Sequence, residues 1–156
     1  MINYTMKIDD LDRKILEFLQ KDGRMAASHI ADELDISVPT VTDRIKKLSE
    51  SGVIQGFHAT LNPKFLGLDV SAIITVISES SEHYKEVIQT ARNTPEVVQC
   101  YSTTGKGSHT LIIVAKNSQA LEELLRKIQS WPGVSRTETQ VILSSYALSH
   151  NTYAIN

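Results

Sequence analysis

The sequence has few of the residues that mark several large protein classes. It contains one cysteine, Cys100, in 156 residues, which excludes an internal disulfide. Seven Gly and four Pro, with no low-complexity segment, exclude a collagen-like or disordered chain. No stretch approaches the roughly 18 apolar residues of a membrane span, and the start, MINYTMKIDD, lacks the basic and apolar regions of a signal peptide. We expect a globular, cytoplasmic protein with Cys100 as a buried, unreactive thiol.

Positive charge is also scarce. The formal net charge is −2, and residues 1–60 contain eight Lys or Arg against ten Asp or Glu. Proteins that bind nucleic acid usually carry a basic domain. If this chain binds DNA, its cations must be few and well placed.

Motifs for catalysis and metal binding are missing. The five His residues (29, 58, 83, 109 and 150) show no HxH, HExxH or Cys/His spacing, so we expect surface histidines, no metal and no cofactor. The GKG at 105–107 lacks the strand-loop-helix context of a phosphate loop, and no Ser/His/Asp motif occurs. The sequence predicts no catalytic residue. Trp131, before Pro132, is expected to pack at a helix end.

The first sixty residues contain three segments with helical periodicity. They span 9–20, 27–34 and 37–51, and the last begins with a good N-cap, Ser37, and is followed by Gly52. Three residues, 35–37, connect the short second helix to the longer third one, which is the spacing of a helix-turn-helix. The run VIQGFHATL at 53–61 resembles a strand. Residues 1–60 are therefore predicted to form a winged helix-turn-helix domain.

The third helix has a polar face opposite its apolar stripe. At 100° per residue, small polar groups lie on the N-terminal part of that face and cations follow. This order suits a recognition helix, whose first residues reach base edges while later ones meet phosphates. The alternative is an ordinary solvated face. The predicted DNA-binding residues are Ser37, Pro39, Thr40, Thr42, Asp43, Arg44, Lys46 and Lys47.

After a linker at 61–69, the chain repeats its apolar pattern at a spacing of 37 residues. Residues 74–77 correspond to 111–114, residues 84–91 to 121–128, and TPEV at 94–97 to WPGV at 131–134. Each half predicts a strand, a helix and a second strand. Residues 70–156 are therefore predicted to form a ferredoxin-like βαββαβ domain, which makes the whole chain α+β.

The first strand of each half is almost continuously apolar, as in SAIITVI and TLIIVA. A half-solvated strand would alternate, so both faces of this sheet require cover. Helices cover one face. We expect a homodimer that packs sheet against sheet, which would also supply the twofold symmetry needed for two DNA half-sites.

With both halves described, the chain resembles the Lrp/AsnC family of feast/famine regulators over essentially its full length. The matching segments include LDRKIL at 11–16, DISVPTVTDRIKKL at 35–48, SGVIQGF at 51–57, TG at 104–105 and PGV at 132–134, with Thr139 in the last strand. The resemblance implies a transcription regulator that binds double-stranded DNA. It also implies that dimers assemble into tetramers or octamers, and that an amino acid binds between dimers as effector.

Two positions depart from the family pattern. Ala26 stands where the family usually has a Ser or Thr that caps the second helix, so that helix is expected to lose about 1 kcal/mol of capping. In the loop TTGKGSHT at 103–110, Ser108 and His109 replace an Asp and an aromatic residue, which disfavours an ordinary α-amino acid and suggests a pH-sensitive contact from His109. The alternative is a flexible turn. The predicted effector-binding residues are Thr103, Thr104, Gly105, Gly107, Ser108, His109 and Thr139.

Two other functions stay open on the sequence. Siroheme decarboxylases share this two-domain layout and use His and Arg in the C-terminal domain, where His109 and Arg136 are the candidates here. An architectural DNA-binding protein without an effector is the third interpretation, and an empty, metabolite-insensitive loop at 103–110 would favour it.

Overall fold

The structure is a computed structural model that describes residues 7–146, 153 and 155. Its contacts divide the chain into two compact units. A helical unit ends at Thr60 but also includes the final residues from Tyr146 on, and a sheet-containing unit spans Leu61–Ser145. The final residues were expected in the second domain. Tyr153, which is among the described residues, instead contacts the helical unit, because the Gln20 side-chain amide accepts from the Tyr153 backbone N–H at 2.6 Å and donates to the Tyr153 carbonyl at 3.3 Å.

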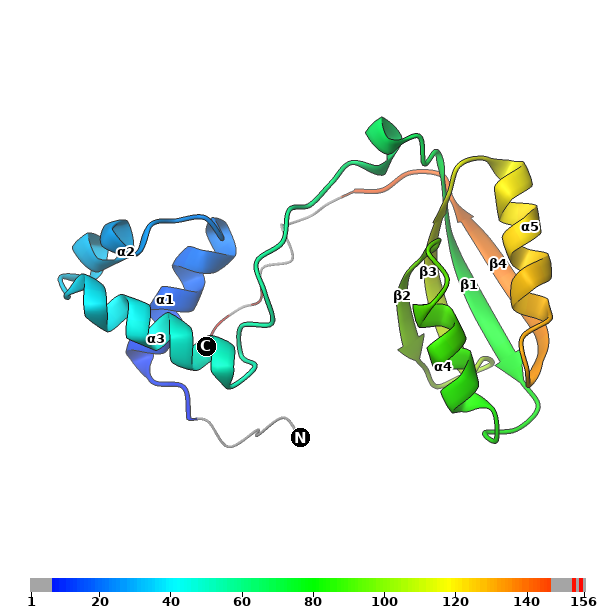
Figure 1. The fold of residues 1–156 in the computed structure, drawn as a ribbon, viewed down its shortest axis with the longest axis horizontal. Helices are drawn as coiled ribbons and strands as arrows, with labels where there is room; N and C mark the ends of the chain where they lie inside the picture. The colour runs from blue at the N-terminus through cyan, green and yellow to red at the C-terminus, as the bar shows by residue number, and fades with distance from the viewer. Residues whose placement is uncertain (1–6, 147–152, 154, 156) are drawn as a thin grey trace. The chain divides into compact units, whose positions relative to one another are not determined.

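The helical unit contains α1 (Asp10–Lys21), α2 (Ala27–Leu34) and α3 (Val38–Glu50) (Figure 1). Ser37 caps α3 as predicted, since its Oγ accepts from the Thr40 backbone N–H at 3.3 Å. Ala26 begins α2 with no side-chain cap, again as predicted. Asp35 adopts the left-handed conformation with φ of 53°, which turns the chain between α2 and α3. The helix-turn-helix prediction is confirmed. The buried core of the helical unit consists of Ile15, Ile30, Ala31 and Val41.

The predicted wing is not a strand. Residues 53–61 carry no regular element, and the linker that follows contains a single 3₁₀ turn, Pro63–Leu66. A strand requires a neighbour to satisfy its backbone groups. Within the described part of the helical unit no second strand is available to pair with this segment.

The second unit contains β1 (Val70–Ser78), α4 (Tyr84–Arg92), β2 (Val97–Ser102), β3 (His109–Ala115), α5 (Ser118–Gln129) and β4 (Val134–Ile142). The strands form one antiparallel sheet in the order β2-β3-β1-β4. This is the βαββαβ arrangement predicted from the internal repeat, and Figure 1 shows α4 and α5 packed beside the strands.

The two faces of the sheet differ in burial. Along β1, the fully buried Ala72, Ile74 and Val76 alternate with half-buried residues such as Ile73 and Thr75. The buried set packs with residues of α4 and α5 in one core, so both helices cover the same face. Trp131, 5% exposed, joins this core at the end of α5, as expected. The other face of the sheet, called the open face below, is covered by neither α4 nor α5.

The helices are short relative to a lipid bilayer. Over residues 7–146, 153 and 155, none has the length and hydropathy needed to cross a membrane.

Candidate functional site

Helix α3 presents a polar face built by its own periodicity. Val41 and Leu48 are fully buried, and this orients the opposite side of the helix outward. The exposed side chains on that side are Pro39, Thr42, Asp43, Lys46 and Lys47, with Ser37 at the cap, while Thr40 and Arg44 are half-buried. The structure therefore groups all eight predicted DNA-binding residues on α3 and its cap.

Two threonine hydroxyls on this face already form hydrogen bonds within the helix and its cap. Thr40 Oγ1 lies 2.7 Å from Ser37 Oγ within the helix cap. Thr42 Oγ1 donates to the carbonyls of Pro39 at 3.0 Å and Val38 at 3.2 Å. Their methyl groups and acceptor lone pairs are what remain for a base edge. These two residues are suited to contact a thymine methyl or to accept a hydrogen bond.

The two lysines differ in how firmly they are held. Lys47 Nζ lies 2.8 Å from the carboxylate of Asp43, and this contact lowers the pKa of Asp43. Lys46 Nζ lies 3.9 Å from Glu50, a looser contact. Both side chains are largely exposed, at 73% for Lys46 and 60% for Lys47. Exposed pairs of this kind stabilise little, so either ammonium can exchange its carboxylate for a phosphate.

Arg44 is held inside the unit. Its guanidinium pairs with Asp9 and also donates to Asp12 at 3.1 Å, so that it links α3 to the start of α1. Hydrogen bonds to these two carboxylates raise the pKa of Arg44, and the pKa of Asp9 is lowered by the Asp12 backbone N–H and by Arg44. The two acids were not singled out from the sequence. Their spacing matches a capping box, Asp-x-x-Asp before an apolar run, and that signal could have identified them.

The predicted effector loop joins β2 to β3 and is fastened to β1. The Ser108 backbone N–H donates to the Val76 carbonyl at 2.9 Å, and the Thr103 N–H donates to the Ser108 carbonyl at 3.0 Å. Gly107 passes so close to β1 that a Cβ there would lie 2.2 Å from Thr75 Cγ2. Gly105 has φ of 101°, a conformation open to glycine. Thr103, Thr104 and Gly105 are exposed, so the tip of the loop is accessible.

His109 is buried, unlike the exposed residues at the tip of the loop. Its side chain is 0% exposed on the helix-covered face, which corrects the expectation of a surface histidine. The alternation of β3 explains this, since His109 is in phase with the buried Leu111 and Ile113. Burial lowers its pKa. Of the other histidines, His29 and His58 are exposed, His83 is half-buried and His150 lies outside the described residues.

The register separates the remaining candidates. Thr139 pairs with the buried Ile74, and Arg136 pairs with Ile77 of the open face. His109 pairs with Val76, the residue next to Ile77. Because successive residues of a strand point to opposite faces, His109 and Arg136 lie on opposite sides of the sheet. His109 and Arg136, the candidates for a siroheme-decarboxylase-like site, therefore do not face one another within one chain.

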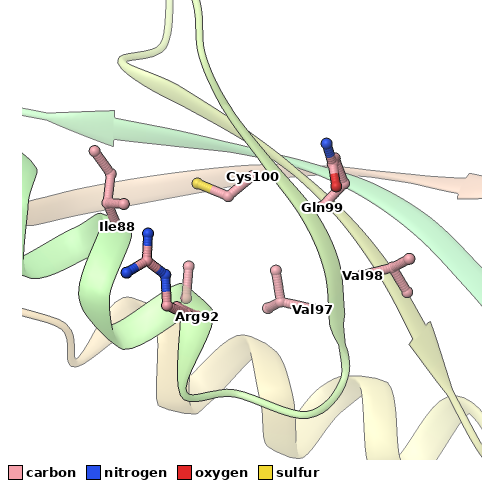
Figure 2. A pocket seen from close by; sticks show the side chains of 7 residues that line it. Ile88, Arg92, Val97, Val98, Gln99 and Cys100 are labelled. Carbon is pink, nitrogen blue, oxygen red and sulfur yellow. The ribbon is translucent and has the colours of Figure 1, made fainter. Parts of the chain in front are cut away.

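A groove of about 330 Å³ lies between α4 and the edge strand β2. Figure 2 shows it with Ile88 and Arg92 on the helix and with Val97, Val98 and Cys100 from the strand. None of the residues predicted for DNA or effector binding lines it. Cys100 is half-buried here, and burial raises the pKa of its thiol. Nowhere in the described residues do three His, Cys, Asp or Glu side chains gather in a way that could hold a metal ion.

Comparison with known proteins matches both units. Residues 8–55 match the family model for a winged helix-turn-helix DNA-binding domain, and residues 70–151 match that for the Lrp/AsnC ligand binding domain. The regulatory protein AsnC of Escherichia coli is 34% identical over 93% of this chain and 95% of its own length. The transcriptional regulator FL11 of Pyrococcus furiosus is 39% identical over 87% of this chain and 89% of its own length.

Solved structures agree with this fold. The structure of E. coli AsnC has a TM-score of 0.84 at 32% identity and covers 92% of this chain and 97% of its own. A feast or famine regulatory protein of Mycobacterium tuberculosis, complexed with L-methionine, has a TM-score of 0.88 at 30% identity, covering 96% of this chain and 100% of its own.

Proposed function

The chain belongs to the Lrp/AsnC family of helix-turn-helix transcription regulators, and from this premise we propose how its own residues bind DNA, assemble and take an effector. The observation that carries the proposal is the polar face of α3, exposed directly after the three-residue turn. A helix in this position enters the major groove with its N-terminal residues toward the bases.

On DNA, Pro39, Thr40, Thr42 and Asp43 face base edges, and Lys46 and Lys47 meet phosphates. Ser37 holds the start of the helix through its cap. The bonds of Arg44 to Asp9 and Asp12 support a different main role for that residue: it fixes the angle of α3, and its remaining N–H groups reach a phosphate. Because each chain offers few cations, tight binding requires several dimers on phased sites.

We infer that the open face of the sheet is the surface on which two chains pair. Ile73 of β1 and Ile112 of β3 are cross-strand partners on that face, and Tyr101 of β2 remains 49% exposed there. Apolar area of this kind favours a partner over water. Dimers then assemble further into tetramers or octamers, and the regulator acts in the cytoplasm.

The effector proposal concerns the exposed tip of the loop at 103–108. The hydroxyls of Thr103 and Thr104, with the backbone at Gly105, offer polar contacts to a small molecule of the amino-acid class. The relative solved with L-methionine supports this class. Gly107, Ser108 and His109 act by holding the loop, since Gly107 and Ser108 are fastened to β1 and His109 is buried. Thr139, on the helix-covered face, supports the sheet behind them.

A footprint on the DNA upstream of the protein's own gene, repeated across a salt series, tests this function. The test variant is a double substitution, Lys46→Ala with Lys47→Ala. The matched control is Lys127→Ala on α5. We expect protected patches about one helical turn apart. The lysine variant is expected to lower the slope of the salt dependence by about one unit for each lysine removed, which is about two units per chain and about four per bound dimer. Equal protection by wild type and variant at every salt concentration would contradict the assignment of α3. Adding L-methionine tests the effector, because an unchanged footprint would favour an architectural binder.

A further inference from the structure

The imidazole of His109 sits inside the second unit, directly behind the effector loop. It is 0% exposed, and the ring of Tyr84, at the start of α4, meets it edge-to-face with centroids 4.9 Å apart and planes at 86°. Such a contact suits a neutral aromatic ring in a packed core. A titratable ring therefore occupies this core position.

A short chain of hydrogen bonds links that ring to the loop. Ser108 Oγ lies 2.9 Å from His109 Nδ1, 2.9 Å from Ser78 Oγ and 3.3 Å from the Val76 carbonyl. The backbone of Ser108 holds the loop closed on both sides, through Val76 and Thr103. One residue therefore connects the buried imidazole, the end of β1 and the closure of the loop.

The site has room for the neutral ring and no partner for a second proton. Nε2 is buried without a hydrogen-bond partner among the described residues. If Nδ1 carries the proton and donates to Ser108, a proton added at Nε2 becomes a buried charged donor without an acceptor. If Ser108 donates to Nδ1, protonation there turns Ser108 Oγ into the acceptor, and the Nε2–H of the charged ring is still buried without an acceptor. In both tautomers the charged ring is unfavourable in place, because a buried charge needs a partner.

The neighbouring elements provide no compensating charge. The titratable groups of the adjacent elements are Tyr84 of α4, which meets the ring, and Cys100 of β2, which pairs with Leu111 two residues along β3. His83, directly before Tyr84, is half-buried and lies 3.9 Å from the carboxylate of Glu86. The charged residues of α4 (Lys85, Glu86 and Arg92) and of α5 (Glu122, Glu123, Arg126 and Lys127) are all exposed, and Arg136 and Glu138 of β4 belong to the open face. Burial is the cause of the lowered pKa of His109.

We propose that His109 is a pH-sensitive lock on the loop at 103–108: the neutral ring under α4 keeps the loop fastened to β1, and protonation expels the ring and releases the loop. Loop opening is favoured at low pH because only the open form binds the proton readily. Its exposed imidazole is protonated near pH 6.5, whereas the closed form resists protonation. The closed form is therefore most favoured above that pH and becomes less favoured below it. Between pH 7.5 and 5.5 the open population rises by up to about tenfold.

Release of the loop would also weaken effector binding, and this consequence rests on the proposed function of the loop. The opening of the loop itself does not depend on that function. The opening is therefore measured without any ligand. Amide hydrogen exchange, corrected for the intrinsic pH dependence of exchange, reports on the Thr103 and Ser108 amides, whose hydrogen bonds close the loop. The Val114 amide, bonded to the Glu96 carbonyl at 2.9 Å on β3, is the internal reference.

In the wild type we expect exchange at Thr103 and Ser108 to rise by up to about tenfold relative to Val114 between pH 7.5 and 5.5. His109→Phe keeps an aromatic ring against Tyr84 without a titrating group and is expected to abolish this rise. His58→Gln, at an exposed histidine of the helical unit, is expected to retain it. An equal rise in His109→Phe, or no rise in the wild type, overturns the proposal.

An NMR titration of the wild-type imidazole keeps the proposal testable if His109→Phe folds poorly. The lock predicts a neutral His109 ring at pH 7 and protonation coupled to changes at Thr103 and Ser108. An ordinary titration near pH 6.5 that leaves those amides unchanged overturns it. A loop that opens with pH but binds no L-methionine would contradict the proposed effector and support the lock.

Discussion

The guanidinium of Arg44 on α3 donates to the buried carboxylate of Asp12 on α1 at 3.1 Å. Asp12 is 1% exposed, and its second oxygen accepts from the Asp9 backbone N–H at 3.1 Å. This pair fixes the helix that carries the DNA-binding face to the first helix of the unit. Arg44 thus serves the stability of the unit before it serves any contact with DNA.

Arg44→Ala is expected to destabilise the helical unit and to lower its unfolding midpoint, because it leaves the Asp12 carboxylate buried without its cation. Chemical denaturation measures this loss. Lys47→Ala, which removes an exposed cation from the same helix, is the matched control and is expected to change stability by less than about 0.5 kcal/mol. Equal stability of Arg44→Ala and wild type would contradict the structural role.

Ala26→Ser is expected to stabilise α2. The backbone at Ala26 has φ of −66° and ψ of 138°, the extended conformation of an N-cap, and no side chain accepts from the first turn. A serine there gains about 1 kcal/mol, seen as a higher unfolding midpoint. Ala27→Ser, one residue further on and inside the helix, provides no cap and is expected to bring no gain. A destabilising Ala26→Ser would show that the cap geometry is wrong.

Gly107→Ala is expected to loosen the effector loop. The added Cβ would lie 2.2 Å from Thr75 Cγ2 and 2.9 Å from the Val76 carbonyl, so the loop must move away from β1. We expect faster exchange at the Ser108 amide and an unfolding free energy lower by about 1–3 kcal/mol. Adding Thr75→Ser removes the Cγ2 clash and leaves the carbonyl contact, so it is expected to restore part of the loss. No recovery in the double variant would argue against this packing.

Ile112→Glu is expected to prevent dimer formation. Ile112 pairs with Ile73 on the open face, where a second chain is proposed to pack, and a carboxylate there would be buried without a partner. Sedimentation equilibrium is expected to show monomers for this variant and larger species for the wild type. Glu122→Gln on the exposed side of α5 serves as the control. A variant that assembles as the wild type does would remove the open face as the interface.

Cys100 is expected to react slowly with thiol reagents. Burial raises its pKa above the ordinary value, so less thiolate is present at a given pH than in a free cysteine. The alkylation rate of the folded protein should stay below that of an unfolded sample at pH 8 and rise with pH beyond the range where a free thiol has levelled off. A folded-state rate equal to the unfolded one would contradict the burial.

Much of the fold could be read from periodicity. Helical spacing predicted α1, α2 and α3 close to their observed bounds, and the repeat of 37 residues predicted the order of strands and helices in the second unit. These predictions succeed because local spacing decides which face of an element is apolar. The prediction of a strand at 53–61 was wrong because a strand also needs a neighbouring strand, and residue spacing cannot reveal whether one is present.

Parts of the candidate sites were likewise predictable from local spacing, and other parts were not. The sequence by itself determined the polar face of α3 and the accessible glycine loop, because both depend on residues close together in the chain. Only the tertiary structure decided that Arg44 binds Asp12, 32 residues away, and that His109 lies in the core against Tyr84. It also decided that His109 and Arg136 stand on opposite faces of the sheet. Partners distant in sequence meet through strand register and helix packing, and these decide whether a charged side chain faces water or a buried carboxylate.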